Sequence, residues 1–207
     1  MRSILIFALL WFVCGNCGAV VLIDQNTRNG SFETGQWNPW DFSDNVLVHD
    51  VTFASDGSYY AELQTTTGRE SIFQRDFSID KNAGSAFMFQ IDVRNGTNPF
   101  DELDVSVYGW TYSGQFIYTL PGNRFDIPAE AADTWVTITD TRTFNPSDWQ
   151  ELDVRTLYFS IQFSKNNWVQ GELLQGFLDN ITLTQIPEPA TVLLLGIGAT
   201  LLRKKRT

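Results

Sequence analysis

The sequence predicts an all-β fold, a two-sheet antiparallel β-sandwich of the jelly-roll type, placed between two apolar end segments. Three observations predict it. Apolar and polar residues alternate with a period of two in segments that recur along the middle of the chain. Turn-forming pairs such as Asn95-Gly96 separate these segments. No long stretch of the middle has apolar residues at helical spacing, and eight or more strands imply two packed sheets.

Three predicted strands, at residues 85–94, 102–112 and 156–164, have one apolar face and one polar or aromatic face. The apolar faces are expected to enter the core: Phe87, Phe89, Ile91 and Val93; Leu103, Val105 and Val107; Leu157, Phe159, Ile161 and Phe163. Further strands are expected at residues 46–54, 59–64, 71–79, 134–141 and 176–185.

Length and composition favour one domain and exclude several kinds of site. The chain has 207 residues, and its two cysteines, Cys14 and Cys17, both lie in the first apolar segment, so a protein cut after them has no thiol or zinc cluster. His49 is the single candidate for a histidine-based site and falls in a strand pattern. Without its ends the domain carries about −14, which repels nucleic acid and anionic lipid and favours cations. A solvated acidic surface is the alternative interpretation.

The N-terminus has the pattern of a secretory signal peptide. Arg2 precedes an unbroken apolar run at residues 4–13, and small residues follow as far as Ala19. We expect signal peptidase to cut after Ala19, so that residues 1–19 are removed. Cleavage before Cys17, as in a lipoprotein, is the alternative, and Asn16 fits it poorly.

The C-terminus, residues 187–207, contains an acidic residue between prolines, an uncharged apolar segment and a basic cluster at residues 203–206. The apolar segment, residues 190–202, predicts a short transmembrane helix of about 20 Å, against a hydrocarbon core of about 30 Å. Basic residues beside such a segment stay in the cytoplasm, which places residues 20–186 outside the inner membrane. An ordinary C-terminal anchor is the alternative.

This order of elements resembles the PEP-CTERM sorting signal of Gram-negative bacteria, with Pro187, Glu188 and Pro189 as the triplet. The resemblance implies that an exosortase recognises the tail and that the helix is held in the inner membrane only transiently. It also implies an outer-surface or extracellular-matrix protein that accompanies exopolysaccharide and biofilm formation.

A second resemblance spans residues 29–183. Asn29-Gly30-Ser31-Phe32-Glu33, the segments 56–63 and 177–183, and Trp37, Trp40 and Trp135 together look like the carbohydrate-binding-module jelly roll, also called the galactose-binding-like fold. In that family a structural calcium ion ties the N-terminal segment to the last strand, and the matching residues here are Glu33 and Asp179. Leu178 stands where the family has a second acidic residue. A surface Glu33 and a turn-capping Asp179 are the alternatives.

Sugar recognition needs aromatic rings that stack on a pyranose and polar groups that reach its hydroxyls. The non-core faces of the three alternating strands offer both, provided that these strands share one sheet. Tyr108, Trp110 and Tyr158 would form the platform, and the polar contacts would be Gln90, Arg94, Asp104 and Gln162. The alternative is that the tryptophans belong to the core.

No Gly-x-Ser-x-Gly elbow, zinc-helix motif or phosphate loop occurs, so we expect no enzyme. The leading hypothesis is a non-catalytic, exported matrix or envelope protein that binds polysaccharide. A structural component that binds calcium or proteins without sugar specificity is the second hypothesis. A glycan-active enzyme is the third, and it requires two carboxylates at hydrolase spacing.

Overall fold

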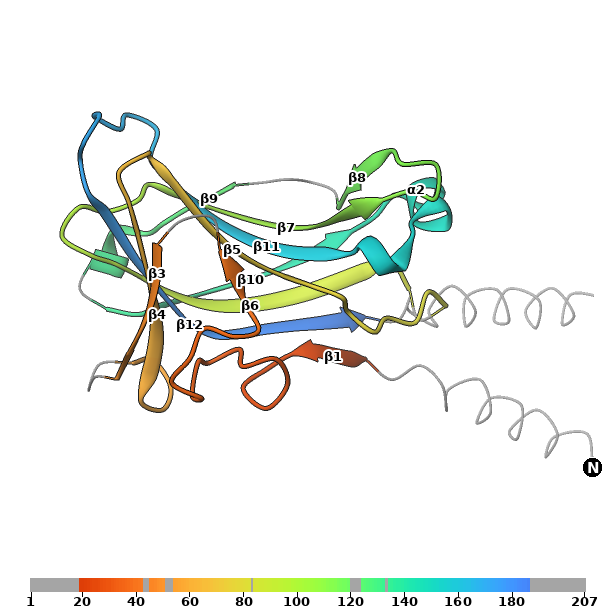
Figure 1. The fold of residues 1–207 in the computed structure, drawn as a ribbon, viewed down its shortest axis with the longest axis horizontal. Coiled ribbons are helices and arrows are strands. Elements are labelled where there is room, and N and C mark those ends of the chain that lie inside the picture. Colours follow the sequence, from red (N-terminus) through yellow and green to blue (C-terminus); the bar gives the residue numbers. More distant parts are fainter. Residues whose placement is uncertain are drawn as a thin grey trace, which may run out of the picture.

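The computed structural model describes residues 19–42, 45–50, 54–82, 84–119, 124–132 and 134–186. The expected signal peptide before Ala19 and the expected sorting tail, residues 187–207, lie outside the described residues. The described chain is almost entirely β, arranged as two antiparallel sheets packed face to face (Figure 1). Within it, no helix has the length and apolar composition needed to cross a bilayer.

Sheet A has five strands in a row and a sixth that pairs beside the row. Their order is β10 (Val136–Thr143), β6 (Ala86–Asn95), β12 (Leu174–Ile186), β4 (Tyr59–Thr65) and β3 (Asn45–Asp50). The sixth strand, β1 (Val20–Ile23), pairs with β12, so that Val20 lies opposite Gln185.

Sheet B has the order β2 (Asp41–Phe42), β5 (Arg69–Arg75), β11 (Tyr158–Ser164), β7 (Glu102–Trp110) and β8 (Phe116–Tyr118). The short strand β9 (Arg124–Asp126) pairs with the beginning of β7, at the opposite end from β8. Helical turns are few: η1 (Ala129–Ala132), α2 (Pro146–Glu151) and η2 (Val154–Thr156).

The strands expected from alternation are confirmed, with ends displaced by a few residues, as β3, β4, β5, β6, β7, β10, β11 and β12. The four strands that the sequence did not predict, β1, β2, β8 and β9, contain two to four residues each. A segment of that length is too short to show a period of two. The helix α2 has Pro146 in its first turn, a position that proline favours.

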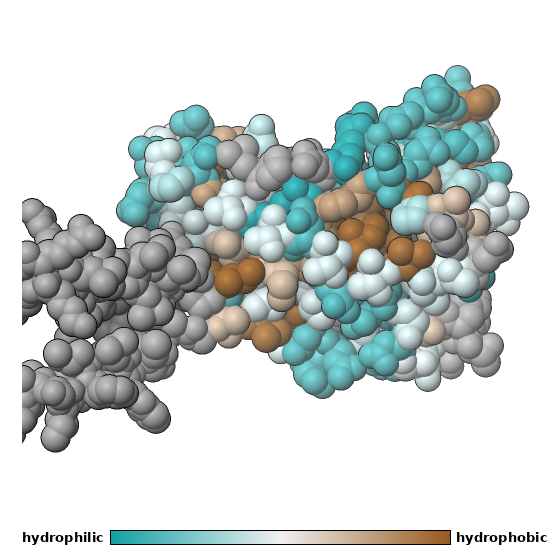
Figure 2. Space-filling view, turned by 180° about the vertical axis from the view of Figure 1, so that it is seen from behind, coloured by the Kyte–Doolittle hydropathy of each residue, from teal (hydrophilic) through white to brown (hydrophobic). Residues whose placement is uncertain are grey.

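The core lies between the sheets and is built from the predicted apolar faces. The expected residues of β6 and β7 and of the segment that includes β11 are all buried, and all belong to one cluster that also includes Leu178, Ile181 and Leu183 of β12. Each large apolar side chain buried there contributes roughly 2 kcal/mol to folding. Figure 2 shows that, on the face seen from behind, apolar surface outside this core is divided into separate patches among polar side chains.

The Asn-Gly-Ser-Phe-Glu segment closes one edge of the core. Asn29 and Phe32 both have positive φ, 53° and 58°, which folds the segment tightly so that Phe32 points inward. The ring of Phe32 lies 6.0 Å from that of Trp40, whose Nε1 donates a hydrogen bond to the Asn29 carbonyl. Trp40 is 1% exposed and belongs to the core, which was the alternative interpretation for the tryptophans, whereas Trp37 is 44% exposed.

Gly30 is where this segment touches β12. The Ile181 N–H donates to the Gly30 carbonyl at 2.8 Å, and the Gly30 N–H donates to the Asp24 carbonyl at 2.8 Å. A Cβ at position 30 would lie 2.1 Å from the Ile181 carbonyl oxygen, which is backbone and has no room to move. The glycine is therefore required by close approach of two backbones.

Both ends of the domain emerge side by side, because β1 starts and β12 ends at the same end of sheet A (Figure 1). The strand β8 and the helix α2 lie at this end too. Every strand in the described residues, and every member of their core cluster, falls between Val20 and Ile186. We therefore expect residues 20–186 to fold as one unit.

We expect Gly30→Ala to destabilise the domain by on the order of 3 kcal/mol, because the added methyl group collides with a backbone carbonyl. Gly114→Ala is the matched control: its Cβ would meet nothing within 4 Å, and its φ of +87° leaves backbone strain of about 1 kcal/mol. Urea unfolding of residues 20–186 measures both. Equal losses in the two variants would contradict the close approach.

Candidate functional site

The outer face of sheet B carries a continuous group of aromatic side chains at the end where β7 stops. On neighbouring strands, Trp110 lies opposite Phe116, and Tyr108 lies between Tyr118 and Tyr158. With one further ring, from β5, they form what we call the aromatic cluster: Phe73, Tyr108, Trp110, Phe116, Tyr118 and Tyr158.

The rings of the aromatic cluster pack on one another. Tyr108 and Tyr158 stack with centroids 5.2 Å apart and planes only 4° apart, so each covers one face of the other. Trp110 meets Tyr158 and Phe116 edge to face, at 5.6 and 5.5 Å. Burial raises the pKa of Tyr108. The most open rings are those of Phe116, 50% exposed, and Tyr118, 51% exposed, which makes them the most accessible stacking surface.

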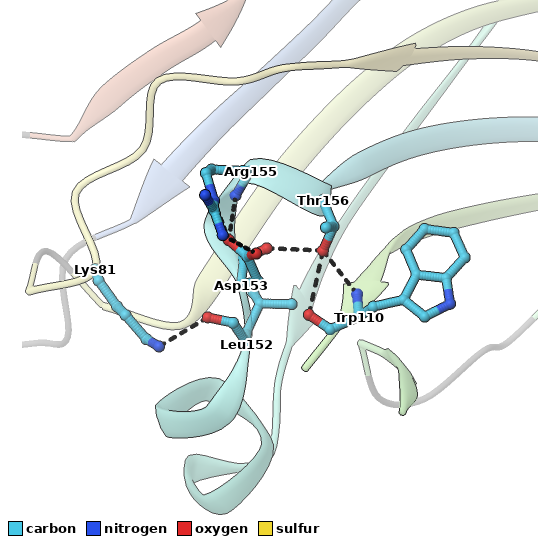
Figure 3. A network of polar contacts seen from close by, with 6 residues as sticks. All are labelled: Lys81, Trp110, Leu152, Asp153, Arg155 and Thr156. Carbon is cyan, nitrogen blue, oxygen red and sulfur yellow. Dashed lines mark hydrogen bonds and ion pairs between the residues drawn. The ribbon is translucent and has the colours of Figure 1, made fainter. Parts of the chain in front are cut away.

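The end of β7 is held in place by the segment after α2. Thr156 Oγ1 accepts a hydrogen bond from the Trp110 N–H at 2.8 Å, and the Asp153 N–H donates to the Trp110 carbonyl at 2.8 Å (Figure 3). Gly109 permits this crossing, because a Cβ there would lie 2.9 Å from the Thr156 carbonyl oxygen. The indole of Trp110 points away from the network, toward the outer face. The backbone of Trp110 is thus fixed while its ring stays available.

Three charged side chains brace the same segment (Figure 3). The Asp153 carboxylate accepts hydrogen bonds from Arg155 Nε at 2.9 Å and Nη2 at 2.7 Å, and the guanidinium lowers the pKa of Asp153. Lys81 Nζ donates to the carbonyls of Gln150 and Leu152, at 2.6 and 2.9 Å. The two hydrogen bonds from Lys81 satisfy carbonyl groups at the end of α2, where no helical partner is available.

The next outward rows of the same face change from aromatic to polar. Ser160 lies between Phe73 and Ser106, and these two serines form a strip of short side chains, which we call the serine strip. One row further, Gln162 lies opposite Ser71 on one side and Asp104 on the other, and Asp104 lies opposite Arg124. These four residues, Ser71, Gln162, Asp104 and Arg124, are the polar row.

The carboxyl groups near the polar row differ in environment. Burial raises the pKa of Asp104, and its Oδ1 is enclosed and accepts no hydrogen bond. The Glu102 carboxylate accepts hydrogen bonds from Asn166 at 2.7 Å, Ser164 at 3.2 Å and Arg124 at 2.9 Å, and these bonds lower the pKa of Glu102. Of these two carboxylates, Asp104 is therefore the one whose charge is poorly compensated by hydrogen bonds.

Five of the seven residues expected to bind sugar share this face: Asp104, Tyr108, Trp110, Tyr158 and Gln162. The condition that all three alternating strands belong to one sheet fails for β6, which pairs with β10 and β12 in sheet A. Gln90 and Arg94 therefore lie on the outer face of the opposite sheet. A jelly roll passes from one sheet to the other between β6 and β7, and alternation alone does not reveal that crossing.

Arg94 has aromatic neighbours of its own on sheet A. It lies opposite Phe177 of β12, and Phe177 meets Tyr60 edge to face at 5.4 Å. The ring of Trp135 lies 6.0 Å from that of Tyr60, and Trp135 is partly buried. Tyr60 and Phe177 are buried, so this group offers less ring surface than the aromatic cluster of sheet B.

Sequence reasoning missed seven residues of the sheet B face: Phe73, Phe116, Tyr118 and Arg124, and the three serines Ser71, Ser106 and Ser160. Phe73 belongs to an expected strand, but nothing in one sequence says that β5 pairs with β11. Phe116 and Tyr118 flank the buried Ile117 in a strand of three residues, and the pattern aromatic, apolar, aromatic was their only signal.

The two residues expected to bind calcium hold one turn, residues 55–59, from two sides. Glu33 Oε1 accepts the N–H groups of Ser58 and Tyr59, both at 2.9 Å. Asp179 Oδ2 accepts the N–H groups of Ser55 and Asp56, at 2.8 and 3.0 Å. The carboxylates thus join the N-terminal segment and the last strand to the same turn through hydrogen bonds.

In this arrangement the carboxylate oxygens of Glu33 and Asp179 accept hydrogen bonds from N–H groups. The arrangement does not fit a calcium ion, which requires six to eight oxygen ligands. No group of three or more acidic, histidine or cysteine side chains is arranged to hold a metal in the part of the chain that the structure describes. Calcium binding at Glu33 and Asp179 stays a prediction, and calorimetric titration of residues 20–186 with calcium is its test.

Asp179 is the most perturbed acid of the domain. Its side chain is fully buried, and burial raises its pKa to about 6. Ser55 Oγ lies 3.0 Å from Asp179 Oδ2 and 2.7 Å from Asp92 Oδ2. A hydroxyl has one hydrogen to donate, so it cannot satisfy two ionised carboxylates at once. A protonated Asp179 resolves this conflict by donating to Ser55.

Comparison with solved structures shows the same fold in carbohydrate-binding modules. The CBM22-1 xylan-binding domain from Paenibacillus barcinonensis Xyn10C has a TM-score of 0.55 and 12% identity, over 83% of this chain and 97% of that one. The CBM22-1 and GH10 modules of a Clostridium thermocellum xylanase, complexed with xylohexaose, give 0.55 and 10%, over 80% and 28%. A xylan-binding CBM 22 domain gives 0.51 and 14%, over 76% and 92%. No protein-family model and no curated protein matches the sequence. At these identities the likeness establishes the fold.

We expect the stability of the domain to fall as pH rises from about 4 to 6, because of Asp179. An unfolded aspartate titrates near 4, so in this window the folded protein binds a proton that the unfolded chain releases. The contribution is complete below about pH 4 and lost above about pH 6, and it amounts to on the order of 3 kcal/mol. Urea unfolding at several pH values, with a chelator present, measures it.

Asp179→Asn removes the titrating group and keeps an acceptor oxygen, so the difference between wild type and variant isolates this one residue. Asp104, whose pKa is also raised, and Glu102, whose pKa is lowered, are present in both proteins and cancel. A difference that stays constant between pH 4 and 6 would show that Asp179 is ionised throughout.

Proposed function

We propose that residues 20–186 form a non-catalytic polysaccharide-binding domain, and that the sugar chain lies on the outer face of sheet B. One observation carries the proposal: the aromatic cluster, the serine strip and the polar row follow one another on a single exposed sheet face. The fold shared with xylan-binding modules supports it, since such a fold hosts sugar binding in those proteins.

The face has the two kinds of group that sugar recognition needs. The open rings of Phe116 and Tyr118 supply apolar surface for the C–H faces of a pyranose. Gln162, Ser71 and Asp104 supply donors and acceptors for hydroxyl groups. The short side chains of the serine strip leave room between the two, so we expect the polysaccharide to run across the strands. Four strands at about 4.8 Å spacing span about 14 Å, enough for more than one sugar ring.

Export and sorting belong to the same proposal. The sequence pattern of residues 1–19 supports cleavage by signal peptidase, and the tail that begins at Pro187 supports recognition by an exosortase in a Gram-negative bacterium. The domain ends at Ile186 beside its own first strand, so cleavage in the tail would leave every described strand intact. The destination would be the outer surface or extracellular matrix.

We expect Phe116→Ala to weaken polysaccharide binding about tenfold, because it removes a ring with half of its surface open to a ligand. Met88→Ala is the matched control: Met88 is 42% exposed and lies on the outer face of sheet A. Affinity electrophoresis of residues 20–186 in gels that contain soluble xylan or another matrix polysaccharide measures both.

Retardation of wild type and Met88→Ala, with Phe116→Ala migrating faster, is the expected pattern. Folded wild-type protein that no polysaccharide retards would remove the proposal and favour a structural matrix component without sugar specificity. Equal weakening by both variants would place the binding surface elsewhere on the domain.

A further inference from the structure

Asp104 stands apart from the other charged groups on the sheet B face. It lies in the middle of the polar row, between Gln162 and Arg124, and one row from the serine strip. Its Oδ1 is enclosed and accepts no hydrogen bond. Its side chain is partly exposed, so a ligand on the face can approach the carboxyl group. A ligand that reaches the exposed part of this side chain therefore meets a carboxylate whose enclosed oxygen no hydrogen bond compensates.

The arginines whose charges act on this carboxylate are paired with other acids. Arg124 Nη1 donates to Glu102 Oε2 at 2.9 Å, and Arg142 Nη1 lies 3.4 Å from Asp140 Oδ2. Within the described residues, no lysine or arginine forms an ion pair with Asp104. The positive charges of Arg124 and Arg142 lower the pKa of Asp104, but neither side chain is bonded to it. A positive charge supplied by a ligand would find Asp104 available.

The charge of the whole domain acts in the same direction. About −14 on residues 20–186 repels polysaccharides that carry carboxylate or sulfate groups and attracts cationic ones. The aromatic cluster adds to this, because ring faces attract ammonium groups. The net charge of the domain, the Asp104 carboxylate and the aromatic cluster therefore all favour a positively charged ligand.

We propose that this face prefers a polysaccharide with free amino groups, such as a glucosamine polymer, and that a protonated amine of the sugar pairs with the Asp104 carboxylate. This inference rests on the proposed function, and it specifies further that the bound polysaccharide is positively charged. Acetylation of the amines removes the positive charge and, with it, the partner of Asp104. The neighbouring Ser106 and Gln162 accept further hydrogens of the ammonium group.

The test compares two ligands that differ only in acetylation, the hexamers of glucosamine and of N-acetylglucosamine. Calorimetric titration of residues 20–186 at pH 6 and low salt gives the affinity for each. We expect the glucosamine hexamer to bind at least about tenfold more tightly, as one partly desolvated ion pair allows. Added salt should reduce the difference.

Two variants separate a specific pair from general attraction by an acidic protein. Asp104→Asn should lose most of the preference for the glucosamine hexamer. Glu151→Gln removes the same charge from an exposed position at the end of α2, outside the polar row, and should keep the preference. Circular dichroism of both variants checks that the fold is retained.

Equal affinity for the two hexamers overturns the inference, and so does equal loss of preference in the two variants. Failure to bind either hexamer also overturns it. None of these results removes the proposed function if neutral polysaccharide still retards the domain and Phe116→Ala still weakens that retardation. Absence of binding to every polysaccharide, neutral or cationic, removes both.

Discussion

The register of β11 between β5 and β7 is the constraint on which the face depends. Side chains alternate between the two faces of a strand, so a slip of one residue would turn the core outward and the polar row inward. Burial of Phe159, Ile161 and Phe163 prevents such a slip, because each would lose roughly 2 kcal/mol of apolar burial. The same register places Tyr158 beside Tyr108 and Gln162 beside Asp104. The core therefore positions the outer surface.

The aromatic cluster is organised before any ligand arrives. Tyr108 and Tyr158 are stacked, and the backbone of Trp110 is fixed by Thr156 and Asp153. Ordering a mobile side chain costs about 0.5 to 1.5 kcal/mol on binding, and rings that are already packed avoid most of that cost. The same packing reduces the ring surface left open. Phe116, at the rim of the cluster, keeps the most of it together with its neighbour in β8.

Alternation of apolar and polar residues predicted the strands and their inward faces, since both follow from burial of one side of each strand. It did not predict which strands pair, because pairing depends on contacts between distant segments. Gln90 therefore lies on the sheet opposite Asp104, although both alternate in the same way. The sequence motif around Gly30 predicted the fold, but its physical reason, contact with the Ile181 carbonyl, appears only when both segments are placed.

Compensation of charge distinguishes the structural carboxylates from Asp104, the one that we propose pairs with a ligand. The carboxylates of Glu33 and Asp179 accept hydrogen bonds from backbone N–H groups of a single turn and so join distant segments. Glu102 is satisfied by three side chains. Asp104 keeps one oxygen without a donor on the face that also carries the open aromatic rings. A buried acceptor left unsatisfied costs about 1 to 3 kcal/mol. We therefore propose Asp104 as the group on this face whose charge a ligand would compensate most, through the exposed part of its side chain.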